Sequence, residues 1–149
     1  RMAEWIGGGP VRQVSARQAA RGGEGAQALL VDAAAVHMIL DGEILGLVTA
    51  NYLNPPATGR WGYELVRVFG ERAVLEAVPG EGCVRVLGDT ARRIPVEEGR
   101  SDYLARVLSA MSGRKDALPP PDILFHPTFA AMEARRSARS GGRWRSLPG

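Results

Sequence analysis

Residues 51–78 read NYLNPPATGRWGYELVRVFGERAVLEAV, and the order of their segments is the most informative part of the sequence. A strand ends at Tyr52 and leads into a loop rich in Pro and Gly that carries Trp61 and Gly62. Two short apolar segments then follow on either side of a turn that begins at Gly70. Short β-prone segments bounded by Gly and Pro are typical of antiparallel strands, so the sequence predicts a strand, a loop and a hairpin here.

A second hairpin is predicted directly upstream. Residues 33–40 and 43–53 are apolar runs separated by Asp41 and Gly42. Asp-Gly favours a type I′ turn, which needs two consecutive residues with positive φ, so this pair predicts a tight β-hairpin. The strand over residues 44–52 is apolar on both faces, and such a strand needs cover on both faces. Helices can cover one face, and a second subunit or a further domain the other.

Downstream, the same pattern continues as a meander. Strands are predicted over residues 64–69, 73–78, 83–87 and 91–96, with Gly in each intervening turn. A spacing of about ten residues between short strands is typical of antiparallel sheets.

Helices are predicted at both ends of the chain. Residues 2–6 resemble the last turn of a helix that Gly7 and the following Gly-Gly-Pro bring to an end. One C-terminal helix begins after the N-cap Ser101 and ends before Gly113, and its apolar residues lie on one face. A second follows the Pro triplet and ends at Gly141, with a kink or restart expected at Pro127.

Two lesser segments complete the prediction. Residues 11–17 alternate loosely and suggest a strand, and residues 143–147 suggest a short edge strand. Residues 21–27 are rich in Gly and predict a loop. The fold class is therefore α+β: a mainly antiparallel sheet of about six strands with two C-terminal helices packed on one face.

Composition narrows the class of protein. The chain has 149 residues, of which 45% are hydrophobic, and this suits one packed domain. Its basic residues are 18 Arg and one Lys with a net charge of only +3, which codon usage in a GC-rich genome explains. Cys83 is the single cysteine, which fits a reducing compartment, and no apolar run reaches membrane-spanning length. We therefore expect a cytoplasmic protein.

The order of these motifs resembles the second domain of the Gfo/Idh/MocA oxidoreductases. The segments that carry the resemblance are the strand end, the Trp-Gly loop, the two short strands with their Gly turn, and the Ser-Ala pair of the last helix: residues 51–53, 61–62, 67–70, 73–76 and 134–138. In the last of these, Arg136 stands where the family has an acidic residue, which puts any role of that acid in doubt. Residues 1–10 resemble the tail of the helix that joins the family's two domains, so residues 11–149 are predicted to be the second domain.

The resemblance implies that the family's catalytic parts lie outside this chain. NAD or NADP binds to a Gly-rich turn between a strand and a helix, and the glycines at residues 22–25 lack that context. The family's Glu-Lys-Pro motif has no counterpart, because Lys115 lies between two helices. We therefore assign no catalytic, cofactor or metal-binding residue, and expect an N-terminal Rossmann domain of the same protein as partner.

The loop after the long strand carries the candidate substrate-facing residues. They combine aromatic rings with amide, guanidinium and hydroxyl groups: Asn51, Tyr52, Asn54, Arg60 and Trp61. Polyol and sugar sites use a flat ring against one sugar face and polar donors for the hydroxyls. The alternative is that the aromatic residues pack in the core and Arg60 is solvated.

Other chemically distinctive residues favour a structural role. His37 lies within a predicted strand, and His126 precedes a proline where it could cap a helix. Glu64 and Glu76 are strand-surface glutamates, since a glycosidase needs two carboxylates at a defined separation. Cys83 has no basic neighbour nearer than Arg85, so its thiol is expected to be inert.

The resemblance implies the substrate-binding and oligomer-forming domain of an NAD(P)-dependent dehydrogenase acting on a sugar, polyol or related hydroxyl compound. The chain alone is expected to be inactive, and a homo-oligomer is expected to form through the sheet face. The alternative is a non-catalytic binding or assembly module that uses an open sheet face. The arginines of residues 135–145 could bind a nucleic acid, but this partner is disfavoured because few aromatic residues are interleaved with them.

Overall fold

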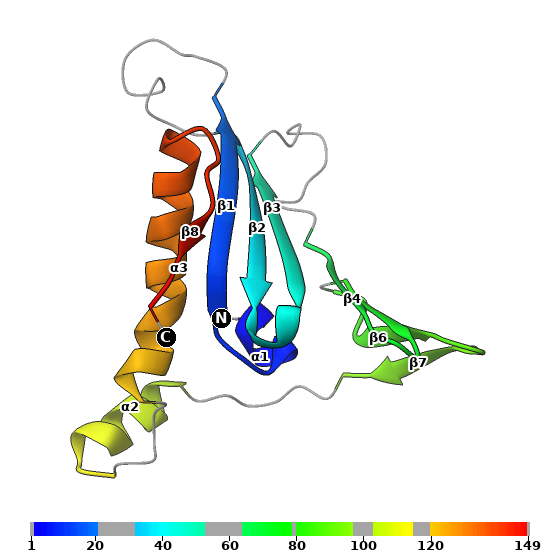
Figure 1. Cartoon of the computed structure of the whole chain (residues 1–149). Helices are drawn as coiled ribbons and strands as arrows, with labels where there is room; N and C mark the ends of the chain where they lie inside the picture. The colour runs from blue at the N-terminus through cyan, green and yellow to red at the C-terminus, as the bar shows by residue number, and fades with distance from the viewer. Residues whose placement is uncertain are drawn as a thin grey trace. The chain divides into compact units, whose positions relative to one another are not determined.

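The computed structural model describes residues 2–20, 32–52, 64–78, 80–96, 103–114 and 120–148. The chain divides into two compact units, the first formed by Arg1–Leu53 with Ser112–Gly149 and the second by Asn54–Met111. The predicted α+β class is confirmed, because helices accompany antiparallel sheets (Figure 1). The described strands form two sheets of four, not one sheet of about six.

The first unit contains a sheet with the strand order β3-β2-β1-β8, in which every pair is antiparallel. Its strands are β1 (Val11–Ala19), β2 (Ala33–Leu40), β3 (Leu45–Asn51) and β8 (Arg145–Ser146). The predicted strands at residues 11–17 and 143–147 are thus confirmed, the latter as an edge strand beside β1. The predicted loop at residues 21–27 lies outside the described residues.

Helix α1 (Met2–Gly7) precedes β1 and ends as the glycine-rich sequence predicts. Gly8 has φ of +74°, a left-handed conformation that is open to glycine and costs other residues energy. Residues 1–10 belong to the same compact unit as the first sheet. The domain boundary at residue 10 that the family resemblance implies stays a prediction.

The hairpin between β2 and β3 is confirmed, but its turn is not the predicted type I′. Four residues separate the strands, and Asp41–Glu43 form a 3₁₀ turn, η2. The positive φ values fall on Gly42 (+73°) and Glu43 (+60°), not on Asp41. Asp41 is held elsewhere: its carboxylate accepts two hydrogen bonds from Arg12 and its backbone N–H donates to Pro10. These contacts hold Asp41 from outside the hairpin. The two consecutive residues with positive φ are therefore Gly42 and Glu43, one position later than in the predicted turn.

Helix α3 (Pro121–Arg139) runs along one face of the first sheet (Figure 1). It continues through Pro127 as one helix, so the predicted restart at that residue is wrong. A proline removes one backbone donor, and packing of the helix against β1 can offset the loss of that single bond. The core lies between α3 and the sheet and consists of small and medium apolar residues: Val11, Val14, Ala16, Met38, Leu40, Ala130, Ala134 and Leu147.

The two faces of the first sheet differ in cover. Strand register places Ala16, Val36 and Val48 in one row on the face toward α3. Residues of opposite parity, including Leu45 and Leu47, lie on the other face, which no described helix of the first unit is found to cover. Leu45 is 80% exposed and Leu47 62%. The predicted strand with two apolar faces is therefore present, and the described residues of the first unit leave its outer face uncovered.

The second unit contains the predicted antiparallel meander. Its strands follow the order β4-β5-β6-β7 and comprise Val66–Phe69, Val74–Ala77, Cys83–Leu87 and Ala91–Pro95. The unit also includes α2 (Tyr103–Met111), after which Gly113 has φ of +92°, as expected for a residue that follows a helix. The predicted N-cap Ser101 lies outside the described residues.

Candidate functional site

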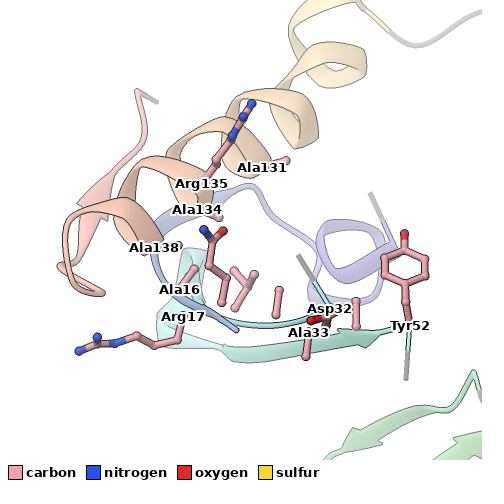
Figure 2. A pocket seen from close by; sticks show the side chains of 13 residues that line it. Ala16, Arg17, Asp32, Ala33, Tyr52, Ala131, Ala134, Arg135 and Ala138 are labelled. Atoms are coloured by element: carbon pink, nitrogen blue, oxygen red, sulfur yellow. The ribbon is translucent and has the colours of Figure 1, made fainter. Parts of the chain in front are cut away.

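A cavity of about 430 Å³ lies within the first unit, between α3 and the ends of β1, β2 and β3. Its walls are mostly methyl groups, because alanines of the helix face alanines of the sheet (Figure 2). The helix contributes Ala131, Ala134 and Ala138 from successive turns, spaced three and four residues apart on one helical face. Small side chains on both layers leave the space that larger residues would fill.

Strand register explains which sheet residues line the cavity. Gln18 pairs with Ala34, and Ala34 pairs with Ala50, so these three residues form one row across the sheet. Because side chains alternate between faces along a strand, Gln18 shares its face with the core residue Ala16. Tyr52 follows Ala50 by two residues, and its backbone N–H donates to the carbonyl of Asp32 at 2.8 Å. This bond holds the end of β3 beside the start of β2.

Polar groups gather at the rim of the cavity. Tyr52, Asp32 and Arg135 line it together with Gln18. The Tyr52 side chain is 81% exposed, and Figure 2 shows its ring standing at the opposite side of the cavity from Ala138. Arg17 also borders the cavity, but in Figure 2 its side chain extends away from the helix. The arrangement is an apolar floor with an aromatic ring, an amide and a carboxylate around its opening, whereas the guanidinium of Arg135 extends away from the floor in Figure 2.

The predicted substrate-facing residues are only partly described. Tyr52 lines the cavity, whereas Asn51 ends β3 opposite Ala33 and is not among the lining residues. Asn51 therefore does not join Tyr52 at this site. Asn54, Arg60 and Trp61 lie outside the described residues, so their proximity to a substrate stays a prediction.

Nothing in the sequence singles out Gln18 or Asp32, and Arg135 stands out there only as part of a basic cluster. Gln18 lies in a loosely alternating strand, and Asp32 immediately precedes an alanine run, so neither carries a recognisable motif. One available signal was the small-residue spacing of the last helix, at residues 131, 134 and 138. Such a stripe usually marks close packing, and only the register of the sheet shows that space remains beneath it.

The other chemically distinctive residues have structural surroundings. Glu76 lies 2.5 Å from Arg67 on the neighbouring strand, and its side chain is only 12% exposed, so it forms an ion pair within the sheet. Glu64 is exposed and precedes β4, so it is not the predicted strand residue. His37 is exposed in the middle of β2. His126 lies within α3 and contacts Glu4, so it does not cap a helix as the sequence suggested. Among the described residues, no three His, Cys, Asp or Glu side chains are grouped as a metal site would need.

The described carboxylates whose pKa values are clearly shifted do not line the cavity. A hydrogen bond from Arg12 holds the pKa of Asp41 below its usual value, at the far end of the β2–β3 hairpin. A hydrogen bond from Arg145, and a second from Arg136, likewise lower the pKa of Glu133. These shifts accompany ion pairs between elements of the fold. The cavity thus presents shape and hydrogen-bonding groups, which suit the binding and orientation of a small molecule.

Among the described helices, none is both long and apolar enough to cross a lipid bilayer. Comparison of the sequence with family models gives no match, and comparison with curated proteins gives none either.

Comparison with solved structures shows the fold. A predicted oxidoreductase from Thermotoga maritima superposes with a TM-score of 0.82 at 22% identity, over 97% of this chain and 43% of its own. The aldose-aldose oxidoreductase from Caulobacter crescentus, solved with glycerol, gives 0.72 at 16% identity, over 97% and 44%. An inositol dehydrogenase homolog from Azotobacter vinelandii, solved with NAD⁺, gives 0.70 at 16% identity, over 98% and 45%.

The chain therefore spans less than half the length of these three oxidoreductases, while nearly all of it takes part in each superposition. The resemblance identified from the motifs is confirmed at the level of the fold.

Proposed function

We propose that this chain is the substrate-side domain of an NAD(P)-dependent oxidoreductase of the Gfo/Idh/MocA type, acting on a sugar, polyol or related hydroxyl compound. The observation that carries the proposal is the fold likeness, which extends over 97–98% of this chain but only 43–45% of each neighbour described above. A dinucleotide-binding domain, supplied by a separate part of the same protein, accounts for the remaining length.

The strand pairings support the proposal that a separate domain binds the dinucleotide. Dinucleotides bind at the carboxyl ends of parallel strands, where a Gly-rich turn leads into a helix. All six pairings in the described part of the chain are antiparallel. Hydride transfer also needs a group that accepts the hydroxyl proton, and the Glu-Lys-Pro motif of the resembled family has no counterpart in this sequence. In the proposed enzyme the cofactor and the catalytic base come from the other domain.

The cavity beside Tyr52 is the proposed substrate-facing surface of this domain. A hydroxylated ring has one relatively apolar face, which can pack on the tyrosine ring, and hydroxyls that hydrogen-bond to amide, carboxylate and guanidinium groups. Gln18 and Asp32 present an amide and a carboxylate at the rim, and Arg135 borders it. Asn54, Arg60 and Trp61 follow Tyr52 closely in sequence and are proposed to extend the same surface.

The first test is to determine the coding DNA sequence upstream of Arg1. The proposal expects a continuous reading frame that encodes a strand, a G-x-G-x-x-G turn, a helix and then a Glu-Lys-Pro motif. A stop codon immediately upstream, followed by a start codon for this chain, would contradict it. The biochemical test measures reduction of NAD⁺ or NADP⁺ by the full-length protein with a panel of sugars and polyols.

Substitution of Tyr52 then tests the surface itself. Tyr52→Ala is expected to raise KM by roughly tenfold, since loss of an aromatic contact and a hydroxyl bond costs on the order of 1–2 kcal/mol. Phe69→Ala is the matched control, because Phe69 is also an exposed aromatic residue (75%) but belongs to the second unit. An unchanged KM in Tyr52→Ala contradicts the placement of the substrate, while turnover of these substrates still supports the enzyme class.

A second proposed role is assembly through the outer face of the first sheet. Leu45 and Leu47 expose apolar surface there, and both side chains lie on the face opposite the core. Contiguous exposed apolar surface on a sheet is typical of protein interfaces. We propose that two copies of the chain pair through this face, in a symmetric arrangement in which each copy buries the same residues.

A further inference from the structure

The second unit carries a row of charged side chains that crosses all four strands of its sheet. Strand register places Arg67 opposite Glu76, Glu76 opposite Arg85, and Arg85 opposite Arg93. Directly opposed residues share a face of the sheet and lie about 5 Å apart, so these four side chains form one continuous line. The line runs from the outer strand β4 to the outer strand β7.

The charges alternate along the row until its last member. Glu76 contacts Arg67 at 2.5 Å and Arg85 at 3.8 Å. Arg85 also pairs with Glu81 in the turn that precedes its strand. Arg93 makes no hydrogen bond or ion pair with any residue of the described chain. The row therefore ends in an uncompensated positive charge beside another arginine, where like charges directly opposite each other are unfavourable.

The backbone of β7 also has free hydrogen-bonding groups at this point. The N–H of Val96 donates to the carbonyl of Gly82 at 2.9 Å, and the register gives Gly82 and Val96 the same pairing parity as Val84 and Ile94. In an antiparallel ladder, hydrogen-bonded pairs alternate with non-hydrogen-bonded pairs. Val96, Ile94 and Arg92 consequently direct their backbone groups toward β6.

The alternate residues of β7 direct theirs toward the outer edge. Arg93 and Ala91 each offer an N–H and a carbonyl there, while Pro95 offers a carbonyl alone. No other described strand pairs with this edge. At Arg93, therefore, a free backbone pair and an unpaired guanidinium coincide on one residue.

We propose that the edge of β7 is a binding site for an extended peptide segment of another polypeptide that places a carboxylate opposite Arg93. The segment adds a fifth strand to the sheet, pairs its backbone with Arg93, and continues the alternation of charge with a Glu or Asp side chain. The same edge disfavours a second copy of β7 in the register that would place two Arg93 side chains opposite each other. This inference is independent of the proposed enzymatic function.

The test uses the 149-residue chain and two synthetic peptides, each about nine residues long, the length of a long strand. Both alternate Val and Thr, and they differ only at the centre, where one carries Glu and the other Lys. At low ionic strength the Glu peptide is expected to bind roughly fivefold more tightly than the Lys peptide, which corresponds to an exposed cross-strand ion pair. Arg93→Glu is expected to reverse that preference.

Arg72→Glu is the matched control, because Arg72 is an exposed arginine of the same unit that lies in the β4–β5 turn. It should leave the preference for the Glu peptide unchanged. Amide hydrogen exchange supplies a readout that does not depend on charge, since the Glu peptide should slow exchange of the Arg93 N–H in the wild-type chain. Arg93→Gln, which keeps the side chain polar and uncharged, should abolish the preference without reversing it.

Three results would overturn the proposal: no saturable binding of either peptide, equal binding of both, or a preference that Arg93→Glu leaves unchanged. Binding of a single-stranded oligonucleotide to the chain is measured as the last part of the test. If it binds with steep salt dependence, loses affinity in Arg93→Glu, and the Glu peptide does not bind, the row is a polyanion surface and the strand proposal is wrong.

Discussion

Glu4 and His126 lie 122 residues apart in the chain, yet Oε1 of Glu4 is 2.5 Å from Nδ1 of His126. The same carboxylate oxygen accepts a hydrogen bond from the backbone N–H of Val11 at 3.3 Å. The side chains of Glu4 and His126 are only 10% and 16% exposed. One buried carboxylate thus joins α1, the start of β1 and α3, three elements that meet at the lower end of the first sheet in Figure 1.

Breaking this pair should destabilise the first unit. Glu4→Ala and His126→Ala are each expected to lower the free energy of unfolding by about 1–3 kcal/mol, because each leaves a poorly hydrated polar group without its partner. The double variant should lose less than the sum of the two single variants, since both remove one interaction. Urea denaturation followed by circular dichroism measures all three.

Glu71→Ala is a suitable control for that experiment. Glu71 is exposed in the β4–β5 turn, and the same substitution there should change stability by less than about 0.5 kcal/mol. Fully additive losses in the double variant would contradict a direct interaction between Glu4 and His126.

Ser137 is expected to contribute more than its size suggests. It is fully buried, and its hydroxyl accepts from the N–H of Ala16 at 3.0 Å and donates to the carbonyl of Arg143 at 2.6 Å. Ser137→Ala leaves both backbone groups without this partner, and a loss of about 1–3 kcal/mol in unfolding free energy is expected.

The matched control for Ser137 lies one turn further along the chain. Ser140→Ala removes an exposed hydroxyl that bonds only to the carbonyls of Arg136 and Ser137 in its own helix. Its cost should stay below about 0.5 kcal/mol. Equal costs for the two serines would show that the hydroxyl bridge from α3 to β1 does not stabilise the fold.

Acid should weaken the fold partly through Asp41. The hydrogen bond from Arg12 lowers the pKa of Asp41 in the folded state, so between the folded and unfolded pKa values the unfolded state binds more protons. The stabilisation is present above the unfolded pKa of about 3.9 and is lost as pH falls through the folded pKa. Asp41→Asn should therefore lose less stability than wild type when unfolding is measured from about pH 7 to about pH 2.

The same comparison at high ionic strength provides a check. The Arg12 and Asp41 side chains are 39% and 46% exposed, so salt should screen their attraction and narrow the difference between wild type and Asp41→Asn. An identical acid response in the two proteins at low salt would rule out a contribution from this pair.

The outer face of the first sheet should control self-association if the proposed pairing is right. Leu47→Glu places a charge in the middle of that face and is expected to weaken the dimer by at least roughly tenfold, because a charge cannot be buried there without a partner. Sedimentation over a range of concentrations measures the change. Leu104→Glu, an exposed leucine (66%) on α2, serves as the control. A wild-type chain that stays monomeric at high concentration would contradict this role.

Several elements of the fold follow from local sequence. Alternation of apolar residues, with Gly or Asp-Gly in the turns, predicted the β2–β3 hairpin and all four strands of the second sheet. Glycine predicted where α1 ends, and the apolar spacing predicted α2. Local patterns succeed here because backbone preferences and the strand period act over a few residues.

Other features depended on contacts between distant residues. The turn after β2 departs from type I′ because Asp41 is held by Arg12 and Pro10, which lie about thirty residues earlier. Helix α3 runs through Pro127 while it packs against β1. The division of the strands into two sheets is likewise a matter of long-range pairing, which strand patterns alone leave undetermined.

The residues of the candidate site also fall into two groups: one was indicated by local sequence, and the others are brought together only by the tertiary structure. Tyr52 was recognisable from sequence because an aromatic residue at the end of an apolar strand and the start of a polar loop is a common position for ligand contacts. Gln18, Asp32 and Arg135 come from three separate segments, and only tertiary structure brings them around one cavity. Local composition therefore determined most of the strands and where the chain turns between them, and it drew attention to Tyr52, which lines the cavity. Strand register and helix packing decided where the cavity lies, because both depend on which faces meet and on the volume that alanines leave empty.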